Sequence, residues 1–130
     1  MRLCLCLLIA LQTLGCASLW SKKPSEPPVV QEPGEITLRW NGQPDLAGFN
    51  IYRRTENGTD VKVNTSPVRP LVQHPGNRGL IPYQFVDRGV VTGEEYYYTF
   101  EQIEKNGATY RWETPRLMTA SPLARPSTSG

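Results

Sequence analysis

Residues 96 to 100, Tyr-Tyr-Tyr-Thr-Phe, constrain the fold more than any other stretch of this 130-residue chain. Successive side chains of a β-strand point to opposite faces of the sheet. Tyr96, Tyr98 and Phe100 therefore share one face of such a strand, and Tyr97 and Thr99 share the other. Because alternating large apolar side chains indicate a half-buried strand, we expect the first set inside the protein and the second set at its surface.

The same two-residue period recurs along the chain. The stretch EITLRW places Ile36, Leu38 and Trp40 on one face, and the stretch GFNIYRR places Phe49 and Ile51 on one face. No long stretch has the spacing of an amphipathic helix. Short strands separated by turns predict an all-β fold, an immunoglobulin-like antiparallel β-sandwich.

The turn signal at residues 105–107 allows two registers for the last pair of strands. A two-residue turn would bury a glutamate beside Phe100. A three-residue loop, with Gly107 in the left-handed conformation, pairs Phe100 with Trp112 and Glu101 with Arg111. We favour the three-residue loop because it places apolar side chains inside and opposite charges outside. The residues then expected on the core side of the final strand are Tyr110 and Trp112.

The outward-facing positions of these strands form a candidate binding face. Tyrosine and arginine are enriched at binding hot spots, and both residue types gather on this face. Tyrosine is also a good strand former, so a purely structural role is the alternative. The residues of the predicted face are Tyr52, Arg54, Tyr97, Thr99, Glu101 and Arg111.

The first residues have the layout of a secretory signal peptide, residues 1–15, in which Arg2 precedes an apolar run. The run is shorter than the roughly 20 apolar residues that a membrane-spanning helix needs. Its end, Leu-Gly-Cys at 14–16, resembles the lipobox of bacterial lipoproteins, although Thr13 stands where that family usually has Leu. The resemblance implies that Cys16 carries the lipid, with palmitate among its acyl chains, and anchors the protein to a membrane. The residues after Cys16 are not Asp, which by the same resemblance favours the outer membrane.

Composition divides the remaining chain into three parts. Residues 16–34 are rich in proline and charge, which predicts an extended tether. Residues 35–121 form the predicted domain, and residues 122–130 form a disordered polar tail. Removal of the signal peptide leaves only Cys16, which excludes an internal disulfide. Without residues 1–15, the chain has 13 basic and 12 acidic residues, so it lacks the basic excess that would indicate nucleic-acid binding.

Several of these residues together resemble a fibronectin type III domain of the bacterial kind, over residues 35 to 120. Trp40 matches the buried Trp of the family's second strand, and Phe49 the aromatic residue of the third. Phe85 and Asp87 match the end of the strand before the crossover. Gly93 and Tyr96 match the Gly-x-x-Tyr that opens the sixth strand, which implies a buried Tyr96 whose hydroxyl bonds to the backbone. The residues expected in the core are Trp40, Phe49, Ile51, Phe85, Tyr96, Tyr98, Phe100 and Trp112.

No arrangement of residues indicates catalysis, a cofactor or a metal. His74 is the only histidine, and a tetrahedral metal site needs more soft ligands than the mature chain offers. His74 lies in residues 66–82, a segment with four prolines that is long for a compact domain. It is either a binding loop with a basic rim of Arg69, His74 and Arg78, or an elaborated connection between the two sheets.

The sequence therefore predicts a non-catalytic, lipid-anchored protein of the bacterial cell envelope. Its membrane contact is the N-terminal lipid, and its expected partner is another envelope protein, in an interaction or scaffolding role. One alternative is a carbohydrate-binding module that stacks glycans on Tyr52 and Tyr97. A second alternative is an accessory subunit of an envelope enzyme complex. These readings differ in the partner and not in the fold.

Overall fold

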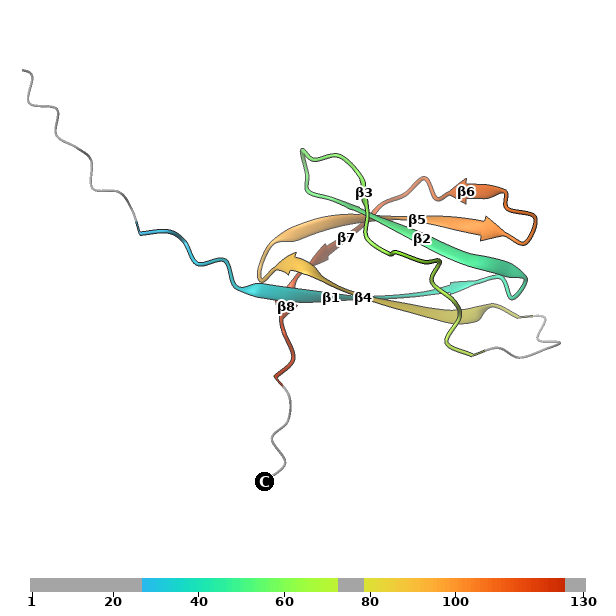
Figure 1. Ribbon diagram of the computed structural model, residues 1–130, viewed down its shortest axis with the longest axis horizontal. Coiled ribbons are helices and arrows are strands. Elements are labelled where there is room, and N and C mark those ends of the chain that lie inside the picture. Colours follow the sequence, from blue (N-terminus) through green and yellow to red (C-terminus); the bar gives the residue numbers. More distant parts are fainter. Residues whose placement is uncertain (1–26, 73–78, 126–130) are drawn as a thin grey trace, which may run out of the picture.

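The computed structural model describes residues 27–72 and 79–125, and within them the protein is all-β with no helix. Figure 1 shows the strands arranged in two layers. The predicted all-β class is therefore confirmed. The strands are β1 (Pro33–Gly42), β2 (Leu46–Arg54), β3 (Val61–Lys62), β4 (Ile81–Val91), β5 (Glu95–Glu104), β6 (Thr109–Arg111), β7 (Arg116–Thr119) and β8 (Ser121–Pro122).

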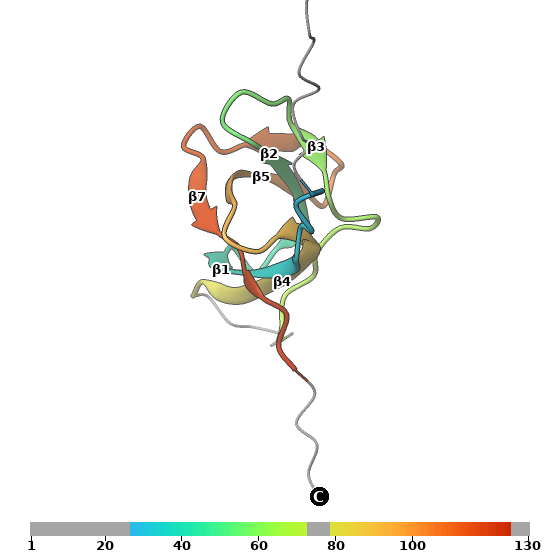
Figure 2. The ribbon, with the colours of Figure 1, turned by 90° about the vertical axis from the view of Figure 1, so that its left-hand side faces the viewer.

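The strands form two antiparallel sheets that face each other like the layers of a sandwich (Figure 2). One sheet has the order β4-β1-β8. The other has the order β3-β2-β5, and both β6 and β7 pair with the remaining edge of β5. Gly34 of β1 pairs with Pro122 of β8, so the described chain enters and leaves the domain at the same end.

The core lies between the two sheets and is rich in aromatic rings. Trp40 stacks on Tyr83 and meets Phe49 edge to face, with ring centres 5.6 and 5.4 Å apart. Phe85 and Trp112 are only partly buried and pack against this cluster. The fully enclosed part of the core contains Ile36, Leu38, Trp40, Leu46, Phe49, Ile51, Ile81, Tyr83, Val90, Tyr96, Tyr98, Phe100 and Ala120.

Strand β5 alternates as its sequence predicts. Tyr96, Tyr98 and Phe100 are buried in the core, whereas Tyr97 is only half-buried. The hydroxyl of Tyr96 accepts a hydrogen bond of 3.1 Å from the backbone N–H of Val91. A large aromatic side chain therefore closes the turn that leads into β5.

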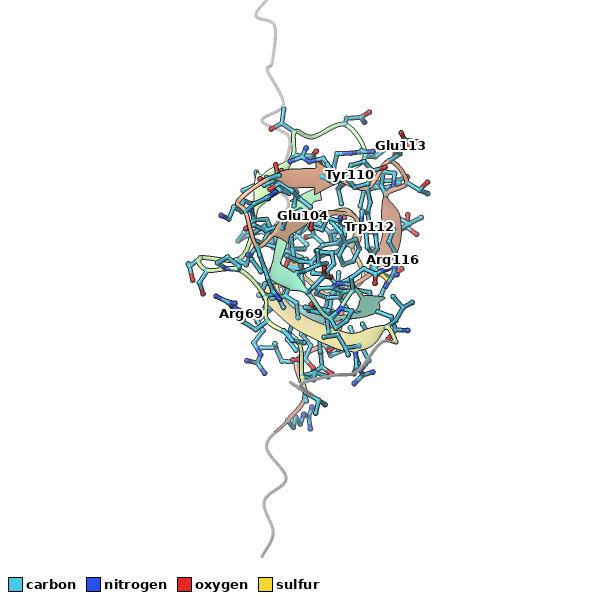
Figure 3. The ribbon with its side chains drawn as sticks, turned by 90° about the vertical axis from the view of Figure 1, so that its right-hand side faces the viewer. Arg69, Glu104, Tyr110, Trp112, Glu113 and Arg116 are labelled. Carbon is cyan, nitrogen blue, oxygen red and sulfur yellow. The ribbon has the colours of Figure 1, made fainter. Side chains whose placement is uncertain are left out.

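The register of the last hairpin is confirmed, but one of its consequences is wrong. Glu101 pairs with Arg111, and Gly107 has a φ of +88° in a loop that joins the two strands. Tyr110, expected in the core, is 56% exposed. It pairs with Gln102, which is itself only partly buried, and it lies on β6, an edge strand with a neighbouring strand on one side only. Figure 3 shows Tyr110 beside β6, at the rim of the molecule.

The segment after β3 covers the outer edge of β2. The side-chain amide of Asn64 replaces the backbone acceptor that a neighbouring strand would supply. Its Oδ1 accepts a 2.7 Å hydrogen bond from the N–H of Ile51. Its Nδ2 donates to the carbonyl of Phe49 at 3.2 Å. Further along, Val68 bridges to Phe49, and Pro70 bridges to Tyr83 of the other sheet. Residues 66–72 thus connect the two sheets.

A polar contact crosses the core between the sheets. Arg53 of β2 pairs with Tyr98 of β5, and both side chains point inward toward Asp87 of β4. The carboxylate of Asp87 accepts hydrogen bonds of 2.7 Å from Arg53 and 2.9 Å from Tyr98. The N–H of Gly89 donates to its other oxygen at 2.9 Å. Because Asp87 is almost fully buried, these donors together replace the water that the carboxylate loses.

The predicted signal peptide and Cys16 lie outside the described residues, as does the part of the tail beyond Arg125. Within the described part, residues 27–32 form no strand and are exposed. Residues 27–72 and 79–125 contain no helix that is long and apolar enough to span a bilayer.

Candidate functional site

The outer face of the five-stranded sheet carries most of the predicted binding residues. The pairing of β2 with β5 sets Tyr52 opposite Thr99 and Arg54 opposite Tyr97. The pairing of β5 with β6 adds Arg111 beside Glu101. Tyr52 and Tyr97 are therefore diagonal neighbours on one face, on adjacent strands.

Arg111 covers the ring of Tyr52. Its guanidinium carbon lies 3.9 Å from the centre of that ring. Its Nη1 also donates a hydrogen bond of 3.1 Å to Oδ2 of Asp60, in the loop before β3. A guanidinium over a tyrosine ring is attracted by the electron-rich face of the ring, and the carboxylate fixes its direction.

Arg54 covers the ring of Tyr97 in the same way, with its guanidinium carbon 4.4 Å from the ring centre. Its Nη1 donates to the backbone carbonyls of Thr55 and Glu56 at 3.2 and 2.9 Å. Its Nε lies 3.9 Å from Oδ1 of Asp60. The carboxylate of Asp60 thus lies between two guanidinium groups, each of which covers one tyrosine.

Glu101 receives two donors on the same face. Its Oε2 accepts a hydrogen bond of 2.8 Å from Nδ2 of Asn50 and one of 3.2 Å from the hydroxyl of Tyr52. The tyrosine is consequently held at both its ring and its hydroxyl. We call the set Tyr52, Arg54, Asp60, Tyr97, Glu101 and Arg111 the Tyr–Arg face.

Thr99 does not belong to the accessible part of this face, contrary to the sequence-based expectation. Only 6% of its surface is exposed. The cause is its size, because the small threonine lies opposite Tyr52 and between Tyr97 and Glu101 on the same side of β5. The larger neighbours screen it, so its hydroxyl is not available to a partner.

The second predicted site, the basic rim of the long loop, is only partly described. Arg69 is exposed in the segment that connects the sheets. Burial, and then the charge of Asp45, raises the pKa of Tyr83, and the charge of Arg69 opposes this shift only in part. His74 and Arg78 lie outside the described residues, so the basic rim of three side chains stays a prediction.

In the part of the chain that the structure describes, the pKa values of two tyrosines, Tyr83 and Tyr98, are raised. Burial, reinforced by the nearby charge of Asp87, raises the pKa of Tyr98 far above its usual range, so this hydroxyl stays protonated. Residues 27–72 and 79–125 contain no group of histidine, cysteine, aspartate and glutamate side chains that could hold a metal ion. A hollow of about 540 Å³ lies beside Tyr97 and is lined mainly by polar side chains, among them Glu56, Glu94 and Glu95.

Sequence reasoning missed Asp60 and Asn50, which position the side chains of the Tyr–Arg face. Asn50 could have been found, because it alternates with Tyr52 and Arg54 on the outward side of β2. Asp60 could not, because it lies in a loop whose path no periodic pattern specifies. Comparison with protein families, curated proteins and solved structures finds no match to this chain.

Proposed function

We propose that this chain is a lipid-anchored, non-catalytic module of the bacterial cell envelope, of the fibronectin type III kind, that binds a protein partner through the Tyr–Arg face. The observation that carries the proposal is the arrangement of Arg54 and Arg111, each over a tyrosine ring and both beside Asp60. No cofactor or metal is required for this role.

Two features support the type III part of the proposal. A tryptophan, Trp40, lies in the core against aromatic rings from both sheets. The hydroxyl of Tyr96 is bonded to a backbone group just upstream, as in the tyrosine corner of sandwich domains. The lipid-anchored part rests on the sequence alone, on the signal peptide and the Leu-Gly-Cys ending at Cys16.

The Tyr–Arg face is suited to a protein partner because its side chains are already ordered. Arginine and tyrosine lose rotamer freedom when a partner immobilises them, and contacts made beforehand reduce this cost. The Arg111 side chain is 41% exposed and donates one hydrogen bond to Asp60. The other N–H groups of its planar guanidinium can bind a carboxylate or a backbone carbonyl of a partner.

The same geometry weakens the carbohydrate alternative. A glycan reader stacks sugar rings on open aromatic faces, but a guanidinium lies over each of Tyr52 and Tyr97. A sugar would first have to displace Arg111 from both the ring and Asp60. A protein partner needs no such displacement, because it can contact the outer side of the guanidinium groups.

Photocrosslinking in intact cells tests the binding role. A photoreactive amino acid at Thr109, an exposed outward position of β6, should capture one envelope protein. The matched control places the same amino acid at Arg88, an exposed position on β4 of the other sheet. Arg111→Ala in the Thr109 variant should abolish the adduct. Equal capture from both positions, or capture that survives Arg111→Ala, would contradict the proposal.

The identity of the captured protein distinguishes the scaffolding role from the remaining alternative, an accessory subunit of an envelope enzyme complex. An enzyme of the envelope would make the chain an accessory subunit, whereas a structural protein would make it a scaffold. Metabolic labelling with a fatty acid tests the anchor independently. The wild-type chain should be labelled, and Cys16→Ser should not. Equal labelling of the two would contradict the proposed lipid anchor, but it would not affect the proposed binding role.

A further inference from the structure

One edge of the three-stranded sheet is open over a short stretch. Strand β1 pairs with β4 along its whole length on one side. On its other side only Gly34 and Glu35 have a strand partner, which is β8. Among the described residues, no strand pairs with this side of β1 from Ile36 onward. An edge of this kind presents backbone groups to which another chain can add a strand.

A side chain shows which backbone groups face this edge. Arg116 of β7 donates a hydrogen bond of 2.7 Å to the backbone carbonyl of Arg39, reaching toward β1 from the other sheet (Figure 3). Backbone groups of successive strand residues point to opposite edges, so the N–H and C=O of Thr37 point the same way as those of Arg39. The open stretch is thus bounded by β8 at Glu35 and by Arg116 at Arg39, with Thr37 at its centre.

A hollow lies directly beside this stretch. It has a volume of about 230 Å³ and lies between β1 and the final strands, on the side of the molecule where β1 and β7 approach each other (Figure 2). Ile36 and Met118 give it an apolar component, and methionine adapts readily to the shape of an incoming side chain. Its lining residues are Glu35, Ile36, Thr37, Met118, Thr119 and Ser121.

The chain itself contains a short segment that fits this edge. Val29 and Val30 are 88% and 84% exposed, more than any other large apolar residue described. β-branched side chains favour strands. Figure 1 shows residues 27–32 leaving the start of β1 and pointing away from both sheets. Pro28 and Pro33 bound the segment and limit it to a strand as short as the open stretch.

The segment of the same molecule cannot reach the edge. The carbonyl of Glu32 accepts a 2.9 Å hydrogen bond from the N–H of Thr92, and Pro33 pairs with Val91. The chain would have to reverse between Val30 and Glu32 and then pass β8, which already occupies the edge at Gly34 and Glu35. The valines of a second molecule meet neither obstacle.

We propose that this protein self-associates by strand addition. The segment around Val29 and Val30 of one copy pairs with the open edge of β1 at Thr37 of another copy. One of the two valines enters the hollow beside Ile36 and Met118. The proposal depends neither on the partner of the Tyr–Arg face nor on the lipid anchor.

Disulfide trapping between two tagged copies of the full chain tests this pairing. One copy carries Val30→Cys and the other carries Thr37→Cys, and the native cysteines stay in both. Co-expression followed by mild oxidation should give a heterodimer on a non-reducing gel. The matched control replaces Thr37→Cys by Arg88→Cys, an exposed position on β4, and should give no heterodimer above the wild-type background.

Variants of the donor segment provide a second readout. Val29→Asp, added to the Val30→Cys copy, should abolish the heterodimer, whereas Val29→Thr, which is also β-branched, should retain it. Both substitutions are at an exposed position, so neither disturbs the core. The proposal fails if the position 88 control crosslinks as well as position 37. It also fails if a single copy that carries both Val30→Cys and Thr37→Cys forms this disulfide within the monomer. The same holds if the Val30→Cys copy crosslinks to a different protein instead.

Discussion

The hydroxyl of Tyr98 donates a hydrogen bond of 2.9 Å to Oδ2 of Asp87, and this bond joins the two sheets through the middle of the core. Arg53 donates to the same oxygen at 2.7 Å. The carboxylate is therefore neutralised by a cation and solvated by hydroxyl and backbone donors, as a buried charge requires. The contacts of Asp87 with Arg53 and Tyr98 fix the position of β4 relative to β2 and β5. Apolar packing alone has no directional bonds and would fix this position less strictly.

Removal of Asp87 should destabilise the domain strongly. In Asp87→Ala, Arg53 loses its counter-ion and Tyr98 loses its acceptor inside the core. We expect a loss of about 3 kcal/mol in the free energy of unfolding, measured by urea denaturation. Tyr98→Phe, which removes only one hydrogen bond, should cost about 1 kcal/mol. Similar values for both variants would show that the ion pair contributes nothing beyond that hydrogen bond.

Stability should fall in alkaline solution because of Tyr98. Burial, and then the charge of Asp87, raises the pKa of Tyr98 in the folded protein, while in the unfolded chain it stays near its ordinary value of about 10. Above that pH the unfolded chain loses a proton that the folded chain keeps, so stability is full below about pH 10 and is lost as pH rises. The slope should approach about 1.4 kcal/mol per pH unit for this residue.

Urea denaturation between about pH 8 and pH 11 measures this slope. Tyr98→Phe should flatten it, and the remainder should come from Tyr83, whose pKa is also raised by burial. An unchanged slope in Tyr98→Phe would show that this hydroxyl does not cause the alkaline loss of stability.

The contact of Arg111 with Tyr52 should be measurable but small. A double-mutant cycle with Arg111→Met and Tyr52→Leu should give a coupling energy of about 0.5–1 kcal/mol, since the pair lies at the surface. Asp60→Ala should reduce this coupling, because the carboxylate holds the guanidinium over the ring. A coupling that is unaffected by Asp60→Ala would mean that the ring alone orders Arg111.

Asn64 should protect one specific backbone amide. Its Oδ1 accepts a hydrogen bond from the N–H of Ile51, in place of a strand partner. In Asn64→Ala we expect the Ile51 amide to exchange with deuterium much faster, and the domain to lose about 1–3 kcal/mol. The amide of Phe49 serves as the internal control, because it donates to Val68 and not to Asn64. Equal acceleration of both amides would indicate general loosening of the edge.

Two glycines should respond differently to alanine. Gly48 has a φ of +147°, and a Cβ there would lie 2.7 Å from the carbonyl oxygen of Val68. Gly93 has a φ of +83°, but nothing lies within 4 Å of its Cβ position. Gly93→Ala should cost about 1 kcal/mol through its backbone conformation alone. Gly48→Ala should cost about 3 kcal/mol, because the connecting segment must move away as well. Thermal unfolding distinguishes the two.

Period-two alternation was sufficient to predict the all-β class, the inward set of β5 and the register of the last hairpin. These three predictions depend on which face of a strand is apolar, and the order of apolar and polar residues in the sequence determines that face. The prediction that Tyr110 is buried was wrong because alternation gives the direction of a side chain but not whether its strand lies at the edge of the sheet. The prediction that Thr99 is accessible on the binding face was wrong because exposure depends on the size of the neighbouring side chains and not only on the face of the strand.

The polar contacts were harder to predict because they join segments far apart in the chain. Arg53 alternates with Ile51 on the inward side, which could have indicated a buried cation that needs a carboxylate. Asp87 was noticed only as part of a family pattern, and nothing local pairs it with Arg53. Asn64 and Asp60 lie in irregular segments, where no periodicity relates a side chain to its partner.

The antiparallel contact of Gly34 with Pro122 has a mechanical consequence. The chain enters β1 and leaves β8 at neighbouring positions, so tension applied between residues before Gly34 and after Pro122 would open the β1–β8 pairing one bond after another rather than shearing its bonds together. Opening bonds one at a time takes less force than shearing them together, so pulling at these two positions should first separate β8 from β1.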